Sequence, residues 1–320
     1  MTRNVPEALA QAVAADWMAA MRAGDFEAAW RATDRIELPR RAGEYAAGPS
    51  HLRWDGTPPD GRQVLVRCLH GLGDTLQFMR FVPQIAQRAG RLHFLVQPML
   101  LDLLQGAPGL GEVSNAWTDD PPQCEVEIEI MELAYALRCR ADTLPPPYPH
   151  LPRQLPATPR VRIEDDGRIR VALLWAASEW DTSRSVPLPA FEPLMRTPGF
   201  AFYSLQQGPA AQDPQLERLG MVALSPHTEA IHEAAAAMMQ MDVVVTIDAM
   251  PAHLAATLGR PTWLMLKHRA DWRWMDGRTD SPWYPTMRLF RQPREGDWDA
   301  VVRDIAAALQ EFRRSFRSAA

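Results

Sequence analysis

Residues 63–75 of the chain run QVLVRCLHGLGDT, an apolar segment that leads into a turn containing two glycines. The run at 63–69 has the composition of a buried β-strand. A helical pattern follows at 74–88, so the glycines mark a passage from strand to helix. Strand–turn–helix units that repeat along a chain form parallel sheets with helices on their faces. We therefore expect this segment to open an α/β domain.

The same alternation continues along the chain. Residues 92–96 form the next apolar run, and 125–130 alternate glutamate with Val or Ile, which predicts an edge strand with one face in water. In the second half we expect strands at 169–175, 201–205, 242–247 and 262–266, and helices near 189–196, 211–219, 229–240 and 297–316. Two such sets predict two Rossmann-like, doubly wound parallel sheets.

Two further segments complete the predicted organisation. Residues 7–36 show helical periodicity interrupted at Gly24, which predicts a helical hairpin. Its segment 24–31 is similar to half of a tetratricopeptide repeat, but no second copy follows at the ~34-residue period, so we expect a cap on the next domain. Prolines crowd 145–159 and predict an extended linker. The expected parts are a hairpin at 1–48, a first domain at 49–155, a second at 156–296 and a closing helix at 297–320.

Composition excludes several classes of protein. The 320 residues are 47% hydrophobic and 23% charged, as in globular proteins, and the formal net charge of −5 gives no basic footprint for nucleic acid or a membrane surface. Lys267 is the single lysine and is not preceded by glycine, so a P-loop is excluded. Every window of about 18 residues carries polar groups, so we expect no transmembrane helix.

The cysteines and the N-terminal residues indicate in which cellular compartment we expect the protein. Cys68, Cys124 and Cys139 are odd in number and lack CxxC spacing, which argues against a disulfide framework or a zinc site. Acidic residues occur early, at Glu7 and Asp16, which is unlike a signal or transit peptide. We expect a cytoplasmic protein without a metal site or a bound cofactor.

The glycine turn is the first candidate site. Backbone N–H groups of a turn between strand and helix can face an anionic or hydroxylated ligand, and Asp74 would place a carboxylate beside it. The alternative is a structural turn in which Asp74 caps the helix, an interaction of about 1 kcal/mol.

The second candidate site is the segment TIDAMPAHLAATLGRP at 246–261. Asp248 follows a predicted buried strand, and Pro251 suits the first turn of a helix that ends before Gly259. The N–H groups of such a helix N-terminus favour a diphosphate, which His253 could also reach. The alternative is that Asp248 caps the helix and His253 is a hydrogen-bonded core residue.

The GLGDT turn, the spacing D-x-x-x-A-H-L-A-A-x-L-G-x-P at 248–261, and the segments DWRW at 271–274 and SPWYPTMRLFRQ at 281–292 resemble glycosyltransferase family 9, the ADP-heptose transferases. They are most similar to the related domains that follow tetratricopeptide repeats in bacterial proteins. The resemblance runs from about residue 51 to residue 309.

This resemblance implies a GT-B architecture, in which two Rossmann-like domains face a cleft and a sugar is transferred with inversion. The first domain would bind the acceptor and the second a nucleotide-sugar donor, without a metal ion. Asp74 matches the general base of the family. The residues that would line the acceptor side of the cleft are His70, Gly71, Gly73, Thr75 and Gln77.

On the donor side, the resemblance implies a basic residue after the first strand of the second domain, a place that Arg184 occupies in WDTSRSVP at 180–187. A guanidinium there would pair with phosphate. The other expected donor-binding residues are Asp248, Ala249, Met250, His253, Asp271 and Trp272. The aromatic residues of this region would either pack in the core or stack on the nucleotide.

The chain also departs from the family. Ala249 and Met250 stand where the family has Thr and a small residue, and His70 replaces a polar or acidic one. Ala249, Met250 and the residual helical hairpin favour, as the alternative function, a non-catalytic binding or scaffold module; a nucleotide-sugar epimerase is a further possibility. As partners we expect a nucleotide-sugar donor and a glycan, lipid-linked glycan or protein acceptor, but no nucleic acid. The hairpin could mediate a homo-oligomer or bind a protein partner.

Overall fold

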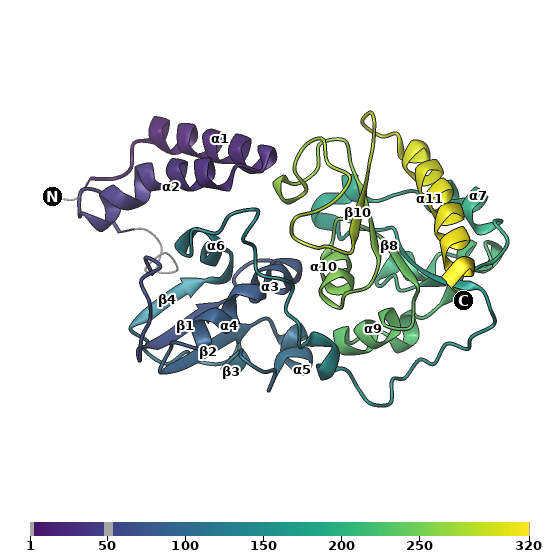
Figure 1. Cartoon of the computed structure of the whole chain (residues 1–320), viewed down its shortest axis with the longest axis horizontal. Helices are drawn as coiled ribbons and strands as arrows, with labels where there is room; N and C mark the ends of the chain where they lie inside the picture. Colours follow the sequence, from purple (N-terminus) through teal and green to yellow (C-terminus); the bar gives the residue numbers. More distant parts are fainter. Residues whose placement is uncertain (1–2, 48–53, 320) are drawn as a thin grey trace. The chain divides into compact units, whose positions relative to one another are not determined.

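The computed structural model describes residues 3–47 and 54–319 (Figure 1). The boundary expected between 48 and 49, and residue 51 where the resemblance begins, lie outside the described residues. Contacts group the chain into two compact units. The first comprises Met1–Tyr148 and Asp271–Arg278, and the second comprises Pro149–Ala270 and Thr279–Ala320. The first break thus falls within the proline-rich stretch that we interpret as a linker.

The first unit is built on a four-stranded parallel sheet. Its strands, in spatial order, are β3 (Glu112–Asn115), β2 (Arg91–Val96), β1 (Gln63–Arg67) and β4 (Val126–Glu129). Its helices are α1 (Glu7–Ala23), α2 (Phe26–Arg41), α3 (Leu72–Phe78), α4 (Val82–Ala86), α5 (Leu101–Leu104) and α6 (Leu133–Ala136), with short 3₁₀ helices η1 (Met79–Phe81), η2 (Pro98–Leu100), η3 (Ile130–Glu132) and η9 (Trp272–Trp274). In the central strand β1, Val64 and Val66 are fully buried, as expected where helices cover a parallel sheet.

The helical pattern at 74–88 does not form one continuous helix. It divides into α3, the 3₁₀ helix η1 and α4. Pro83 explains the division, because proline has no N–H to donate to the carbonyl of Met79 and its ring clashes with that carbonyl in a continuous α-helix.

The edge strand β4 differs from its predicted pattern. It does lie at the edge of the sheet, but Glu129, predicted on a wet face, is only 1% exposed. Its carboxylate accepts the backbone N–H groups of Met131 (2.7 Å) and Leu69 (3.4 Å). These hydrogen bonds replace part of the hydration that the side chain loses on burial.

The predicted hairpin is present and belongs to the first unit. Figure 1 shows α1 and α2 side by side, and Gly24 between them adopts the left-handed conformation that ends α1. The indole of Trp30 on α2 donates to the carbonyl oxygen of Cys139 at 2.7 Å. Asp34 on the same helix pairs with Arg138 (2.6 Å) and accepts the Tyr135 hydroxyl (2.7 Å). The hairpin therefore caps the region around α6.

The second unit is built on a six-stranded parallel sheet. Its strands, in spatial order, are β10 (Met287–Arg291), β9 (Thr262–Leu266), β8 (Val243–Ile247), β5 (Ile169–Leu174), β6 (Phe200–Ser204) and β7 (Val222–Ala223). Its helices are α7 (Glu192–Met195), α8 (Gln215–Arg218), α9 (Ile231–Met238), α10 (Met250–Thr257) and α11 (Trp298–Ala319), with 3₁₀ helices η4 (Leu151–Gln154), η5 (Glu179–Arg184), η6 (Leu188–Phe191), η7 (Pro209–Gln212) and η8 (Ser225–His227).

The core of the second unit follows from strand composition. All five residues of β8 are buried, as are all five of β9, so these strands are covered on both faces. The closing helix α11 begins after Asp297, whose carboxylate caps it by accepting the N–H of Ala300 at 3.2 Å. Its buried residues Val301, Ile305 and Leu309 join the core of this sheet.

Within the described parts of the chain, we find no helix that combines the length and the apolar character needed to cross a membrane.

Candidate active-site residues in the two units

Asp74 lies where the carboxyl end of β1 passes into α3. Gly71 precedes the helix in an extended conformation, and Asp74 is the third helical residue. The Asp74 Oδ2 atom accepts the backbone N–H of Gly71 at 2.9 Å. The turn thus folds back on its own carboxylate, so the N–H of Gly71 is directed at Asp74. The N-cap residue is thus Gly71, and Asp74 stabilises the start of the helix from the third helical position and not as the N-cap.

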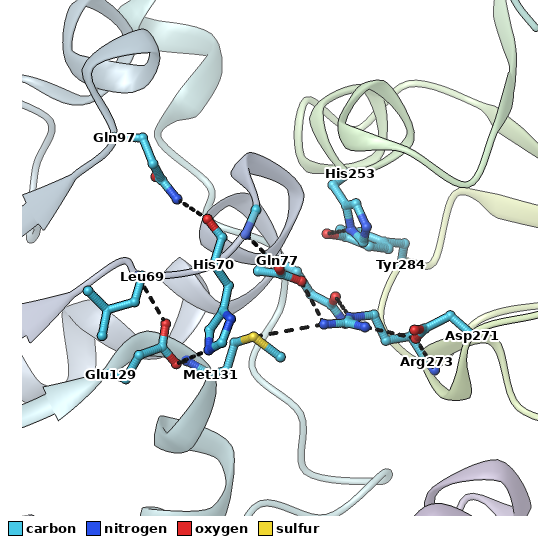
Figure 2. A network of polar contacts seen from close by, with 12 residues as sticks. Leu69, His70, Gln77, Gln97, Glu129, Met131, His253, Asp271, Arg273 and Tyr284 are labelled. Carbon is cyan, nitrogen blue, oxygen red and sulfur yellow. Dashed lines mark hydrogen bonds and ion pairs between the residues drawn. The ribbon is translucent and has the colours of Figure 1, made fainter. Parts of the chain in front are cut away.

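The other oxygen of Asp74 faces a guanidinium. Arg273 donates from Nη2 to Asp74 Oδ1 at 2.6 Å and from Nε to Gln77 Oε1 at 3.0 Å. Its Nη1 atom donates to Asp271 at 2.8 Å, and Figure 2 shows the guanidinium between Gln77 and Asp271. Arg273 is 9% exposed and Gln77 is fully buried. This network fixes the direction of the Asp74 carboxylate.

Thr75 and His70 flank the turn in different ways. The Thr75 hydroxyl is buried and donates to Gln97 Oε1 at 2.9 Å, while Gln97 Nε2 donates to the carbonyl oxygen of His70 at 2.8 Å. Through Gln97, the Thr75 side chain therefore stabilises the turn. The His70 ring is about half exposed, with its Nε2 atom 3.9 Å from Glu129 Oε2 (Figure 2).

Two acidic residues near the turn, Glu129 and Glu132, were not predicted as site residues. Burial raises the pKa of Glu129 to about 7, although hydrogen bonds from the N–H groups of Met131 and Leu69 oppose the rise. Burial, with repulsion from Glu129 and Glu37, also raises the pKa of Glu132 to about 7. In the sequence, Glu129 belongs to an alternating strand, a pattern that is typical of solvent-exposed glutamates, and Glu132 lies just beyond that run.

In the second unit, Arg184 lies at the end of η5, after β5. Its Nη1 atom donates to the carbonyl oxygen of Asp248 at 2.6 Å, and its Nε atom lies 3.4 Å from Asp181 Oδ2. The structure thus brings together Arg184 and Asp248, which the sequence predicted separately. They meet at the carboxyl ends of β5 and β8, the edge where open α/β sheets bind ligands.

Lys267 joins this group from the end of β9. Its ammonium donates to Asp181 Oδ2 at 2.8 Å and to Ser183 Oγ at 2.9 Å. Burial disfavours charge on Asp181, but hydrogen bonds from Lys267 and Ser183 outweigh it and lower the pKa of Asp181. Lys267 was considered only when a P-loop was excluded; its place directly after a predicted buried strand could have marked it.

Helix α10 begins directly after this edge. Ala249 is its N-cap residue, in extended conformation and without a side-chain cap, and Met250 is its first helical residue. His253 is 5% exposed, and its Nδ1 atom lies 3.0 Å from the buried Tyr284 hydroxyl. This contact agrees with the alternative of a hydrogen-bonded core histidine. A contact between His253 and a donor stays a prediction.

The aromatic residues of the tail are mostly core residues. Trp274, Trp283 and Tyr284 are at most 1% exposed, and the ring of Trp263 packs against Phe290 with centroids 5.5 Å apart. Trp272 is only partly buried.

Asp271 and Trp272 lie in the segment 156–296 that we predicted as the donor domain, but the structure groups Asp271–Arg278 with the first unit. The physical reason is that their contacts are made there: Asp271 holds Arg273, and Trp272 packs against Trp17 of α1. Arg273 itself was not among the predicted site residues. Its contact with Asp74 joins residues 199 positions apart, so no local sequence pattern could predict it.

Comparisons with known proteins agree with this architecture. A glycosyl transferase family 9 structure from Veillonella parvula has a TM-score of 0.54 and 13% identity over 80% of this chain and 98% of its own. The E. coli heptosyltransferase WaaC, solved with ADP-2-deoxy-2-fluoro heptose, has a TM-score of 0.52 and 13% identity over 79% of this chain and 99% of its own. The chain therefore has the α/β fold of these GT-B glycosyltransferases, with an N-terminal helical hairpin.

The chain is also similar in sequence to a curated protein. Protein FlbA of Caulobacter vibrioides is 25% identical over 294 residues, which are 82% of this chain and 49% of FlbA. The chain thus spans about half the length of this curated relative. No protein-family model matches the chain.

Proposed function

We propose that this chain is an inverting glycosyltransferase that moves a sugar from a nucleotide-diphosphate donor to an acceptor hydroxyl. The observation that carries the proposal is the pair of cations, Arg184 and Lys267, that share Asp181 at the carboxyl ends of the second sheet. Such a pair, next to the N-terminus of α10, suits the charge of a diphosphate leaving group. The likeness to family 9 structures supports the same class of donor.

The proposed reaction is a single displacement. The acceptor oxygen attacks the anomeric carbon, the bond from that carbon to the diphosphate breaks, and the hydroxyl proton passes to Asp74. One base suffices for such an inverting step. Each oxygen of Asp74 already accepts one hydrogen bond, and a carboxylate oxygen has room for a second. His70 and the glycine turn would lie on the acceptor side.

In the proposed mechanism Arg184, Lys267 and the helix N-terminus neutralise the departing diphosphate, the task that a metal ion performs in other transferases. Asp248 would act through its carbonyl oxygen, which holds Arg184. Ala249, Met250 and His253 would border the donor, and Asp271 would act by holding Arg273.

The first experiment is a titration of the purified chain with nucleoside diphosphates and nucleotide sugars in EDTA, followed by thermal unfolding. A ligand present at 100 times its dissociation constant stabilises the folded state by roughly 2.7 kcal/mol. One nucleotide should raise the unfolding temperature, and Lys267→Ala should reduce the shift by about half or more. The control is Arg196→Ala, which removes an exposed cation directly after α7 of the same unit.

A second candidate is a non-catalytic binding module, favoured by Ala249 at the helix N-cap, where no hydroxyl is available to phosphate. Nucleotide binding without sugar transfer or donor hydrolysis would favour this module. The absence of any nucleotide-induced shift would contradict the donor site itself.

A further inference from the structure

The N-terminal hairpin reaches the segment that orients Asp74. The rings of Trp17 on α1 and Trp272 lie edge to face, with centroids 5.1 Å apart and an interplanar angle of 73°. At the end of the same helix, Arg22 forms a bidentate ion pair with Asp276, at 3.0 and 2.6 Å. The N–H of Asp276 also donates to the carbonyl oxygen of Arg22 at 2.9 Å. Helix α1 thus contacts the 271–276 turn through both side chain and backbone.

The contact between hairpin and turn is close. A Cβ atom built on Gly24, at the end of α1, would lie 3.1 Å from the sulfur of Met275. Met275 itself has a φ of +46°, a left-handed conformation that is rare for a residue with a side chain. Such a conformation persists only where the surroundings impose it. Here the surroundings are the end of α1 and the ion pair next to it.

The same turn carries Arg273. The guanidinium lies over the Trp272 ring, with its Cζ atom 4.5 Å from the ring centroid. Trp272 therefore has Trp17 against it in an edge-to-face contact and the cation of Arg273 over its face. From this position Arg273 donates to Asp74 and Gln77. A continuous series of contacts leads from Trp17 through Trp272 and Arg273 to Asp74.

We propose that the hairpin is a positioning element of the active site. Trp17 and Arg22 hold the 271–276 turn so that Arg273 fixes the direction of the Asp74 carboxylate. The catalytic consequence rests on the proposed function, whereas the mechanical part concerns the folded chain alone. A base that is misdirected by about 1 Å loses rate even when its chemistry is intact, and such losses reach the order of 100-fold.

The mechanical part is tested by amide hydrogen exchange on the whole chain. Trp17→Ala should accelerate exchange at 271–276 at least tenfold, with α2 and the strands of both sheets unchanged. Trp17→Phe keeps an aromatic ring and should restore protection. Met18→Ala, which truncates the exposed neighbour on α1, should behave as the wild type. If Trp17→Ala folds and 271–276 exchange at the wild-type rate, the proposal is overturned.

The catalytic part is tested by kinetics with the donor that the titration identifies. Trp17→Ala should lower kcat about tenfold or more while KM for the donor stays within twofold. Because the effect passes through Arg273, Trp17→Ala should add little to Arg273→Gln in the double variant. Full additivity of the two losses would overturn the proposal. Should the wild type transfer no sugar, the proposed function fails, and the exchange experiment still decides whether the hairpin holds the turn.

Discussion

Arg273 and Asp74 form a 2.6 Å ion pair across 199 positions of the chain, within the first of the two compact units. The guanidinium donates a hydrogen bond to one carboxylate oxygen, and the backbone N–H of Gly71 donates to the other. Two donors from different directions define the plane of the carboxylate. The carboxylate at the carboxyl end of a central strand is thereby held in one orientation, which is what the proposed general base would require.

Replacement of Asp74 tests the proposed base. Asp74→Asn keeps the size of the side chain but cannot take the proton of an acceptor hydroxyl, so transfer should fall by about 10²–10⁴-fold. Donor affinity should change little, because the proposed donor groups belong to the second unit. The measurement is the rate of nucleoside diphosphate release together with donor binding by calorimetry. Undiminished release would remove Asp74 from the mechanism.

Arg184 and Lys267 should contribute separately to donor affinity. Loss of a charge-assisted hydrogen bond costs about 1.5–3 kcal/mol, so Arg184→Ala and Lys267→Ala should each weaken nucleoside diphosphate binding about 10- to 100-fold. Both variants leave Asp181 with fewer partners, so thermal unfolding without ligand serves as the control. Equal affinities in wild type and both variants would place the diphosphate elsewhere.

Glu129 should make stability depend on pH. Its pKa is raised by burial to about 7 in the folded chain, so the folded state binds this proton more tightly than the unfolded state, whose ordinary value is 4.5. The associated stability is fully present below about pH 4.5 and is lost as the pH rises to about 7. The free energy of unfolding of Glu129→Gln, relative to that of the wild type, should therefore rise by about 2 kcal/mol as the pH increases from 5 to 8.

The readout for Glu129→Gln is the free energy of unfolding from urea titrations at several pH values. Glu44→Gln removes the same charge from an exposed position and is the matched control. A Glu129→Gln difference that varies no more with pH than that of the control would contradict the assigned burial of a titrating carboxyl.

Ala249→Thr should improve the N-terminus of α10. The N-cap backbone has φ −155° and ψ 175°, which a β-branched residue adopts without strain, and no side chain caps the helix. A threonine hydroxyl there can accept the N–H of Ala252 and should raise the unfolding free energy by about 1 kcal/mol. It would also offer a donor to phosphate, with a gain in nucleotide affinity of a few-fold. Ala249→Val, which lacks only the hydroxyl, is the matched control, and identical behaviour of the two variants would refute the prediction.

Local pattern was sufficient for much of this chain. The strands around Val64, Phe94 and Val245 follow from short apolar runs, because a parallel strand covered on both faces needs apolar residues throughout. The hairpin follows from helical spacing and from Gly24. The strands β3, β7 and β10 were not predicted. β3 and β7 have only four and two residues, too few for a pattern, and in β10 Arg288 and Arg291 interrupt the apolar run.

The candidate site divides in the same way. The sequence determined that Asp74 follows a glycine turn after β1 and that Asp248 precedes α10, because both positions depend on residues close in the chain. Only the tertiary structure decided that Arg273 pairs with Asp74, that Lys267 and Arg184 share Asp181, and that Glu129 is buried. Ion pairs and burial depend on which distant segments pack together, and periodicity along a chain carries no information about that. For the same reason, the sequence alone assigned Asp271–Arg278 to the second domain, because its neighbours along the chain belong there. Only its packing against α1 makes this segment part of the first unit.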